Sequence, residues 1–285
     1  MKNITLGQYY PSESAMHRMD PRIKVVLAVL YIICATFLAK NIISFALLFV
    51  SAILLVLISR LPLKTVLRSV TPVIFVMLFA SLFQIFGKSG EVPLVDWWII
   101  HIYPEGLYGA GFMIVRIFAL IIGTSIFLTY TTTPIELTDA IEDLLSPLRK
   151  IGVPVHDFAM MMTLALRFIP TLVDEADKIM TAQKARGADF STGSLVQRAK
   201  ALIPVLIPLI VSAFRHAVEL AVAMESRCYR GDKNRTKLVK LQYRLLDIAF
   251  FALTIIFLAA MLALVILPVK LGGEGVLFEV LFYRI

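Results

Sequence analysis

The sequence predicts an all-α integral membrane protein with about five transmembrane helices and a helical cytoplasmic region that contains two long helices. Three observations lead to this fold class. Of the 285 residues, 59% are apolar, and the mean hydropathy is +0.84, which exceeds what a soluble domain of this size carries. Five apolar segments are each long enough to cross a bilayer, which takes about 20 residues. A further segment, 131–243, alternates apolar and charged stretches and contains helix-capping signals.

The apolar segments define the expected spans and the domain organisation. The spans are residues 23–39, 41–58, 70–87, 107–130 and 244–268. We expect three parts: an N-terminal segment with four spans (1–130), cytoplasmic or interfacial helices (131–243), and the last span with a C-terminal tail (244–285). The polar N-terminus contains no short apolar run before a small-residue cleavage site, so we expect no cleavable signal peptide.

The basic residues indicate the orientation in the membrane. Residues 1–24, 59–69 and 131–244 hold 4, 3 and 16 of the 28 Lys and Arg residues. The opposite side holds only Lys40, Lys88, Lys270 and Arg284. Because cytoplasmic loops are enriched in Lys and Arg, we expect a multi-pass membrane protein with its N-terminus in the cytoplasm and its C-terminus outside. The net charge of +8 then follows from topology, and we expect no nucleic acid partner.

Three helices are expected in the cytoplasmic region. The first opens with Thr133-Pro134-Ile135-Glu136, a capping box with proline at the first helical position. The second runs from about Val155 to Arg186 and stops at Gly187. The third opens with a capping box at Ser194 and ends near Arg227. Its apolar run, 201–213, is too short to span a bilayer.

The third helix contains Pro204 and Pro208 within its apolar run, and these should kink it. We expect this helix to lie along the inner membrane interface or to pack on the second helix.

The two long helices end on matching arginine motifs, Ala185-Arg186-Gly187 and Ser226-Arg227-Cys228. For either motif alone, an arginine that complements the helix dipole is the simpler interpretation. The repetition instead favours two similar sockets on a partner, with small neighbours leaving each guanidinium free to enter a groove. A planar guanidinium fits a carboxylate, so we expect acidic sockets. Lys184 and Glu225 occupy equivalent positions, which indicates that the sockets are not identical.

The remaining sequence contains no recognisable catalytic, cofactor or metal site. No G-x-x-x-x-G-K-[ST] phosphate loop occurs, the four histidines are scattered, and no nucleophile–base pair can be identified. These features argue against an intramembrane enzyme. A conventional ABC permease is disfavoured because Glu175-Ala176 is followed by Gly187 at the wrong spacing. A secondary transporter is disfavoured because inverted repeats are missing.

Arg116 is the one Lys or Arg well inside an expected span, because Lys24 and Arg244 lie at span ends and are counted with the cytoplasmic segments. A charge in mid-bilayer costs roughly 2.5–3.5 kcal/mol on insertion scales, so it must face protein or water. Two interpretations stay open with equal weight. Arg116 is either a functional contact or hinge, or an internal hydrogen-bonding group between helices.

Several ordered motifs resemble the transmembrane, or T, component of energy-coupling factor (ECF) transporters, the family that includes the Q protein of cobalt importers. The matching segments are Leu6-Gly7-Gln8-Tyr9-Tyr10, Asp20-Pro21-Arg22, Leu166-Arg167-Phe168-Ile169-Pro170, Ala182 to Gly187, and Leu220 to Tyr229. Cys228 departs from the glycine common after the second arginine, but it is also small.

The resemblance implies a subunit that scaffolds an ATP-driven importer. Two ATPase subunits, identical or different, would each receive one coupling helix, with Arg186 and Arg227 docking in their grooves. A small membrane protein, the S component, would capture a vitamin or metal ion. The chain itself would lie in the bilayer of a prokaryotic cell membrane as scaffold and lever, without enzymatic activity and without cofactors.

Overall fold

The computed structural model describes residues 9–39, 41–87, 95–97, 100–190, 194–229, 231 and 241–271. The chain divides into two compact units. Residues 7–140 and 241–285 form one, here called the membrane unit, and residues 1–6 and 141–240 form the other, here called the arm unit. The three-part domain division expected from the sequence stays a prediction. The charged linker after Tyr229 falls largely outside the described residues, as do Lys40, Lys88 and the C-terminal tail.

The membrane unit contains the five predicted spans as helices. They are α1 (Pro21–Ile33, continued by the π-helix η1, Cys34–Leu38), α2 (Ile42–Ser59), α4 (Ile74–Gly87), α5 (Pro104–Thr124, continued by the π-helix η3, Ser125–Tyr130) and α9 (Leu245–Leu271). Each belongs to a segment long and apolar enough to cross a membrane. The third span starts earlier than expected, because α3 (Leu63–Val70) leads through a 3₁₀ turn at Pro72 into α4.

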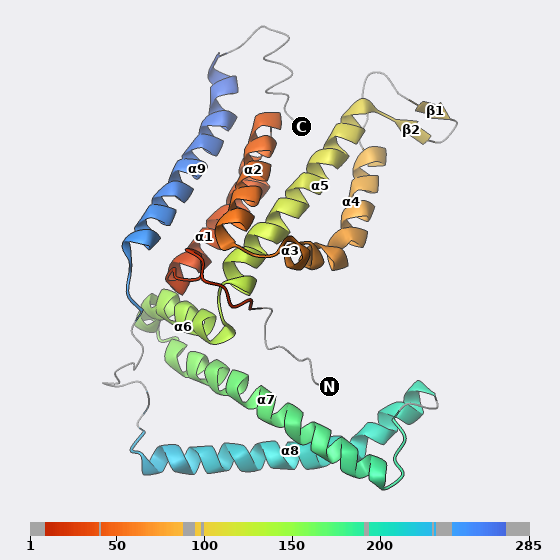
Figure 1. The fold of residues 1–285 in the computed structure, drawn as a ribbon, viewed down its shortest axis with the longest axis vertical. Helices are drawn as coiled ribbons and strands as arrows, with labels where there is room; N and C mark the ends of the chain where they lie inside the picture. Colours follow the sequence, from red (N-terminus) through yellow and green to blue (C-terminus); the bar gives the residue numbers. More distant parts are fainter. Residues whose placement is uncertain are drawn as a thin grey trace. The chain divides into compact units, whose positions relative to one another are not determined.

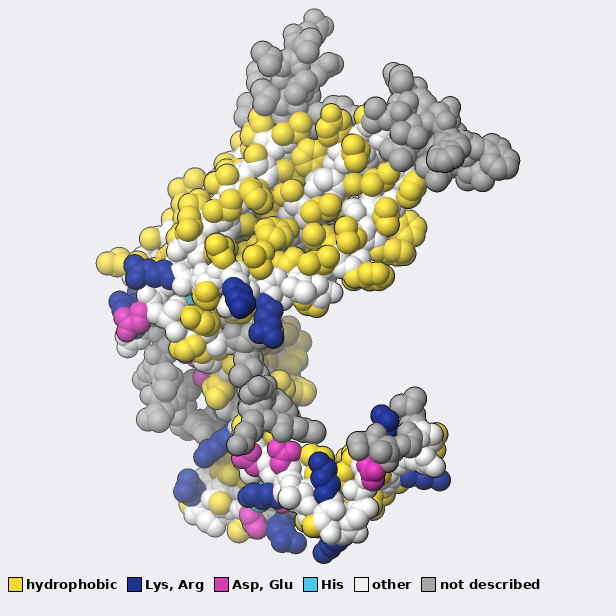
Figure 2. Space-filling view, turned by 45° about the vertical axis from the view of Figure 1, so that its right-hand side comes forward, with side chains coloured by type: hydrophobic (Ala, Val, Ile, Leu, Met, Phe, Trp, Pro, Cys, Tyr) yellow, Lys and Arg dark blue, Asp and Glu magenta, His cyan; other side chains and the backbone are white. Residues whose placement is uncertain are grey.

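The helices of the membrane unit pack side by side around a hydrophobic core, as Figure 1 shows for α1, α2 and α5. Leu27, Leu48, Ile126 and Met261 are fully buried there. Elsewhere the surface of this unit is mainly hydrophobic, as expected for contact with lipid, and Lys and Arg side chains gather at its lower edge (Figure 2).

Glycine allows α5 to approach α1 closely. A Cβ atom on Gly123 would overlap the Tyr31 ring, so any other residue there would require the ring or the helices to move.

A short hairpin precedes α5. Strands β1 (Val95–Trp97) and β2 (Ile100–Ile102) pair antiparallel, with Asp96 opposite His101. Strands of three residues are too short to display a strand periodicity, so the sequence does not predict them.

The two capping boxes predicted in residues 131–243 are confirmed. At the start of α6 (Pro134–Leu145), the Thr133 amide donates to Glu136 Oε2 at 3.0 Å, and the Glu136 amide donates to the Thr133 hydroxyl at 3.3 Å. A 3₁₀ segment, η4 (Ser146–Ile151), follows, and Gly152 ends it with a φ of +88°. Ser194 and Gln197 form the second predicted box.

The arm unit contains the two long helices, α7 (Val155–Ala185) and α8 (Leu195–Ser226). Figure 1 shows them crossing each other. α8 is continuous through Pro204 and Pro208, and it bends near its N-terminal end, as the prolines predict. The whole stretch Val196–Ser226 is long and apolar enough to span a membrane, because residues flanking the apolar run of 201–213 are themselves mildly apolar.

Candidate partner-docking motifs

The first arginine motif forms a compact helix end. Arg186 is the C-cap of α7, and Gly187 follows it in the left-handed conformation with a φ of +88°. The Gly187 amide donates to the Lys184 carbonyl at 3.0 Å, and the Ala188 amide donates to the Gln183 carbonyl at 3.0 Å. These two bonds are the pair that defines a Schellman motif.

The second arginine motif repeats this geometry. Arg227 is the C-cap of α8, and Cys228 has a φ of +56°. The Cys228 amide donates to the Glu225 carbonyl at 2.9 Å, and the Tyr229 amide donates to the Met224 carbonyl at 3.0 Å. The similarity found in the sequence is therefore a similarity of backbone conformation as well.

The side chains of both motifs face outward. Ala185, Arg186 and Gly187 are exposed at the end of α7, and Ser226, Arg227 and Cys228 are exposed at the end of α8. Each arginine is the C-cap of a helix of about 30 residues and directly precedes the residue with left-handed backbone. An exposed cation at such a position is accessible to an acidic groove on another protein.

A polar cluster joins α7 to α8 within the arm unit. The Ser212 hydroxyl of α8 donates a short hydrogen bond to Glu175 Oε1 of α7. His216 Nε2 lies 3.6 Å from Glu175 Oε2, and its ring stacks on Phe168 with centroids 6.3 Å apart. On the other side, His216 Nδ1 lies 3.7 Å from Glu219 Oε2. We call Phe168, Glu175, Ser212, His216 and Glu219 the crossing cluster.

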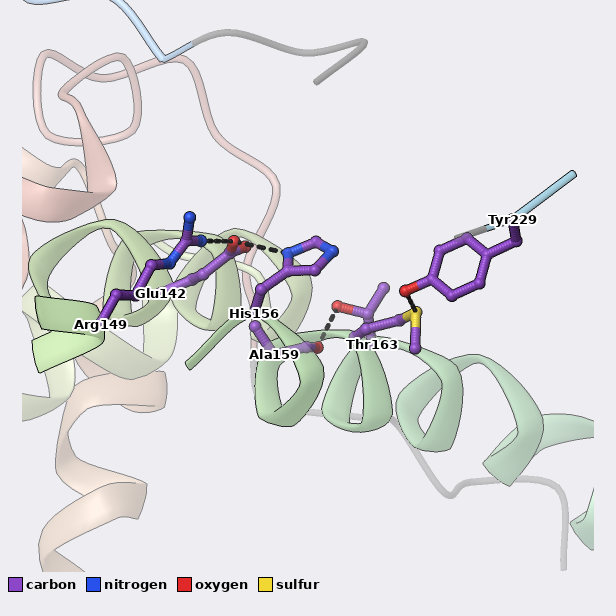
Figure 3. A network of polar contacts seen from close by, with 7 residues as sticks. Glu142, Arg149, His156, Ala159, Thr163 and Tyr229 are labelled. Carbon is purple, nitrogen blue, oxygen red and sulfur yellow. Dashed lines mark hydrogen bonds and ion pairs between the residues drawn. The ribbon is translucent and has the colours of Figure 1, made fainter. Parts of the chain in front are cut away.

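The start of α7 is also fixed by polar contacts, as Figure 3 shows. Glu142 is only 4% exposed, and its Oε1 accepts from Arg149 Nη2 at 3.0 Å and lies 2.9 Å from His156 Nδ1. The Tyr229 hydroxyl donates to the Met160 sulfur at 3.0 Å. Because Tyr229 closes the second Schellman motif, this contact ties Arg227 and its neighbours to α7.

Arg116 makes its described contacts within the membrane unit, apart from the arginine motifs. Its Nη2 donates to the Ala39 carbonyl at 2.7 Å, and its guanidinium lies 5.2 Å from the centre of the Phe45 ring. Ala39 is fully buried at the end of η1. These contacts agree with the interpretation of Arg116 as an internal hydrogen-bonding group; a contact with another protein stays a prediction.

Comparison with known proteins decides the family. Residues 12–238 match the model of the cobalt transport protein family, CbiQ. The chain belongs to this family. An energy-coupling factor transporter transmembrane protein, EcfT, from Ruminiclostridium cellulolyticum is 48% identical over 258 residues, which cover 90% of this chain and 96% of that relative.

Two further EcfT proteins agree. The one from Clostridium kluyveri is 45% identical and matches 95% of this chain and 97% of its own length. The one from Bacillus subtilis is 44% identical and matches 92% and 98%. This CbiQ family member is thus a multi-pass transmembrane component of a bacterial energy-coupling factor transporter, as the sequence motifs predicted.

Two features of the arm unit were not predicted from the sequence. The crossing cluster went unnoticed because its residues on α7 lie at least 37 positions from its residues on α8, without a local pattern that pairs them. The role of Tyr229 could have been found, because a Schellman motif places the second residue after the C-cap beside the helix end.

Proposed function

We propose that this CbiQ family member couples ATP hydrolysis by two partner ATPase subunits to movement of a small substrate-binding membrane protein. The partners would be two ATP-binding subunits, identical or different, and an S component that captures a vitamin or metal ion. The chain would be the non-catalytic scaffold of the complex. The N-terminus and the arm unit would lie in the cytoplasm, and the C-terminus outside.

The main support is that two helices of one unit end in the same exposed cap with arginine at the same position. One capped helix would be explained by helix stability alone, because a cation near a helix C-terminus is favourable. Two copies at the ends of crossing helices suit a partner with two similar sites. An ATPase dimer provides such a pair.

The chemistry of arginine supports acidic grooves as the sockets. A guanidinium presents a planar fork of donors that matches a carboxylate, and it stays charged under all cellular conditions. Lys184 and Glu225 both precede their C-cap arginine by two residues and carry opposite charges. The two sockets should therefore share an acidic centre and differ at the rim, which would let two different ATPases select their own helix.

The crossing cluster supports the transmission of movement between the helices. Glu175 and Ser212 join α7 to α8 near their crossing, so a force on one helix end is carried to the other helix. Because the two long helices are linked where they cross, a movement of one helix end would move the other helix as well. The exposed apolar side chains along α8, such as Leu206, Ile210 and Phe214, would offer a surface for the S component.

The experiment is a double replacement of the two arginines, Arg186→Ala with Arg227→Ala, in the complete transporter. If both arginines dock in desolvated acidic grooves, each replacement should weaken binding by roughly 2–5 kcal/mol. We therefore expect the ATPase subunits to be lost from the purified complex, with the tagged chain still expressed in the membrane. Each single replacement should cause a partial loss.

The matched control is Arg215→Ala, which removes an exposed arginine from α8 away from the helix end. It should leave the ATPase subunits bound. Normal co-purification of the ATPases by the double variant would contradict the proposal. An equal loss in the Arg215 control would show that the net charge of the arm unit matters and the motifs do not.

A further inference from the structure

A pocket of about 610 Å³ lies in the membrane unit and is unrelated to the arginine motifs. Three parts of the chain line it: the N-terminal turn before α1, the end of α2 and the start of α9. The lining residues are Glu13, Ser14, Ala15, Arg18, Leu57, Ile58, Arg60 and Leu246.

Hydrogen bonds hold the three walls together. The Ser12 hydroxyl donates to the Ser59 carbonyl at 3.4 Å, which joins the N-terminal turn to the end of α2. Fully buried Asp247 accepts from the Asp20 amide at 2.9 Å, and from the Arg244 amide at 2.7 Å. This second link joins the same turn to the start of α9. The pocket is therefore built by tertiary structure and does not depend on the rotamer of one exposed side chain.

The pocket lies at the ends of three candidate membrane spans. The candidate spans containing α1 and α9 begin at Pro21 and Leu245, and the span formed by α2 ends at Ser59. All three boundaries adjoin the pocket, so it lies at the depth of lipid headgroups. The charge distribution along the chain assigns this border to the cytoplasmic side, where anionic lipid makes the surface potential negative.

The lining combines cations with exposed apolar side chains. Arg18 and Arg60 supply two guanidinium groups, while Leu57 and Leu246 are 66% and 43% exposed. The acidic group, Glu13, lies 3.4 Å from Arg18, but both side chains are largely exposed, so this ion pair contributes little and can open. A ligand that suits the lining carries an anionic group next to a hydrocarbon chain.

The backbone of Arg60 supports a role for its side chain. Arg60 adopts the left-handed conformation, with a φ of 52° and a ψ of 32°, at the C-cap of α2. Glycine is the residue that adopts this conformation without strain. The orientation of the protein in the membrane explains a basic residue on this side. It does not explain why the basic residue stands at a position with a strained backbone. Strained residues of this kind cluster at ligand sites.

We propose that this pocket binds an anionic phospholipid, with Arg18 and Arg60 on the phosphate and Leu57 and Leu246 along the upper acyl chain. The lipid would lie between the end of α2 and the start of α9 and would fix the N-terminal turn at the membrane surface. This proposal is independent of the docking of ATPases by the arm unit.

The experiment measures which lipid stays bound. The full chain is reconstituted in vesicles of equal parts phosphatidylglycerol and phosphatidylcholine, extracted gently, and its bound lipids are quantified by native mass spectrometry. We expect enrichment of phosphatidylglycerol. Arg18→Gln with Arg60→Gln should abolish this enrichment, because each arginine removed should weaken the binding of the anionic lipid about fivefold. Arg68→Gln, an exposed arginine on the same side of the membrane, is the matched control and should keep the enrichment.

Three results would overturn the proposal. The first is unchanged enrichment of phosphatidylglycerol in the double variant. The second is a loss of enrichment in the Arg68 control as large as the loss in the double variant. The third is binding of inorganic phosphate to lipid-free protein, in a thermal-shift titration, as strong as the binding of phosphatidylglycerol. The last result would assign the pocket to a free anion. Unchanged melting temperatures of the double variant and the control in lipid-free detergent establish that the lost enrichment reflects the site and not the fold.

Discussion

At the scale of the residue, the left-handed backbone after each arginine explains the glycine of the first motif but not the cysteine of the second. Gly187 and Cys228 both have positive φ values, +88° and +56°. Left-handed backbone costs a residue with a Cβ atom roughly 1–2 kcal/mol relative to glycine. Gly187 is predicted as a helix end, and it takes the left-handed conformation of the Schellman motif without strain. Cys228 takes the same conformation with a Cβ atom, so its small size is explained by access for the guanidinium and not by the backbone.

Replacement of Cys228 should therefore change the stability of the end of α8. Cys228→Gly removes the left-handed strain, so we expect the helix end to gain about 1 kcal/mol. Slower amide hydrogen exchange at Cys228 and Tyr229, whose amides make the two cap bonds, would report it. Cys228→Ala is the matched control, because it removes the thiol but keeps the Cβ atom. A gain of the same size in the alanine variant would assign the effect to the thiol and contradict the backbone explanation.

The residue-scale predictions succeeded where the relevant physics is local. Thr133 and Ser194 were identified as helix N-caps because a capping box lies within four consecutive residues. The conformation of Cys228 was not predicted, because no intrinsic preference of cysteine leads to a positive φ. The Arg116 contact with Ala39 was not predicted either, since it joins residues 77 positions apart.

At the scale of the element, a small number of polar contacts joins α7 to α8 where the two helices cross. The Glu175 carboxylate accepts from Ser212 and lies beside His216. These side chains are partly exposed, which limits the strength of each contact. Pro170 inside α7, and Pro204 and Pro208 inside α8, leave both helices continuous. The polar contacts therefore add a specific link where α7 and α8 pack together.

A double-mutant cycle can measure this link. Glu175→Ala and Ser212→Ala each remove one partner of the hydrogen bond, and the double variant removes both. We expect a coupling of about 0.5–1.5 kcal/mol between the two sites, in the range of a single side-chain hydrogen bond. Reversible denaturant unfolding of the purified chain provides the free energies. Thr181→Ala, on the exposed part of α7, is a control that should not couple to Ser212. Additive effects of Glu175 and Ser212 would mean that the contact contributes no specific link.

Element boundaries were predicted well where sequence signals mark them. α7 ends within one residue of the expected position, because glycine follows its C-cap. The π-helical ends of α1 and α5 were missed. In η1, the Ala39 amide donates to the Cys34 carbonyl five residues earlier, and Ala39 also accepts from Arg116. The wider turn of the π-helix accompanies this tertiary contact, so the local sequence alone does not predict it.

At the scale of the whole molecule, hydropathy and charge led to the correct class of protein before any contact was known. Apolar segments must hydrogen-bond their backbone internally in lipid, so long apolar runs become helices. The boundary between the membrane unit and the arm unit does not coincide with the end of an apolar segment. It falls after Ala140 inside α6, where a continuous helix crosses between units and no change in composition marks the site.

The two native cysteines allow a direct test of orientation and docking together. Cys228 is exposed, whereas Cys34 is buried, so a membrane-impermeant maleimide should react with Cys228 alone. We expect no labelling in intact cells and full labelling in inside-out vesicles made from cells that lack the ATPase subunits. Cys228→Ser should abolish the signal, and Lys88→Cys, in the expected outer loop, should label in intact cells.

Addition of the ATPase subunits to the vesicles extends the same assay to the docking proposal. Cys228 lies directly after Arg227, so insertion of this helix end into a groove should shield the thiol and slow its labelling at least tenfold. Arg227→Ala should restore the unprotected rate, because it removes the docked cation while leaving Cys228 in place. Labelling of Cys228 in intact cells would reverse the predicted topology. Unchanged labelling rates with bound ATPases would place their contact elsewhere on the arm unit.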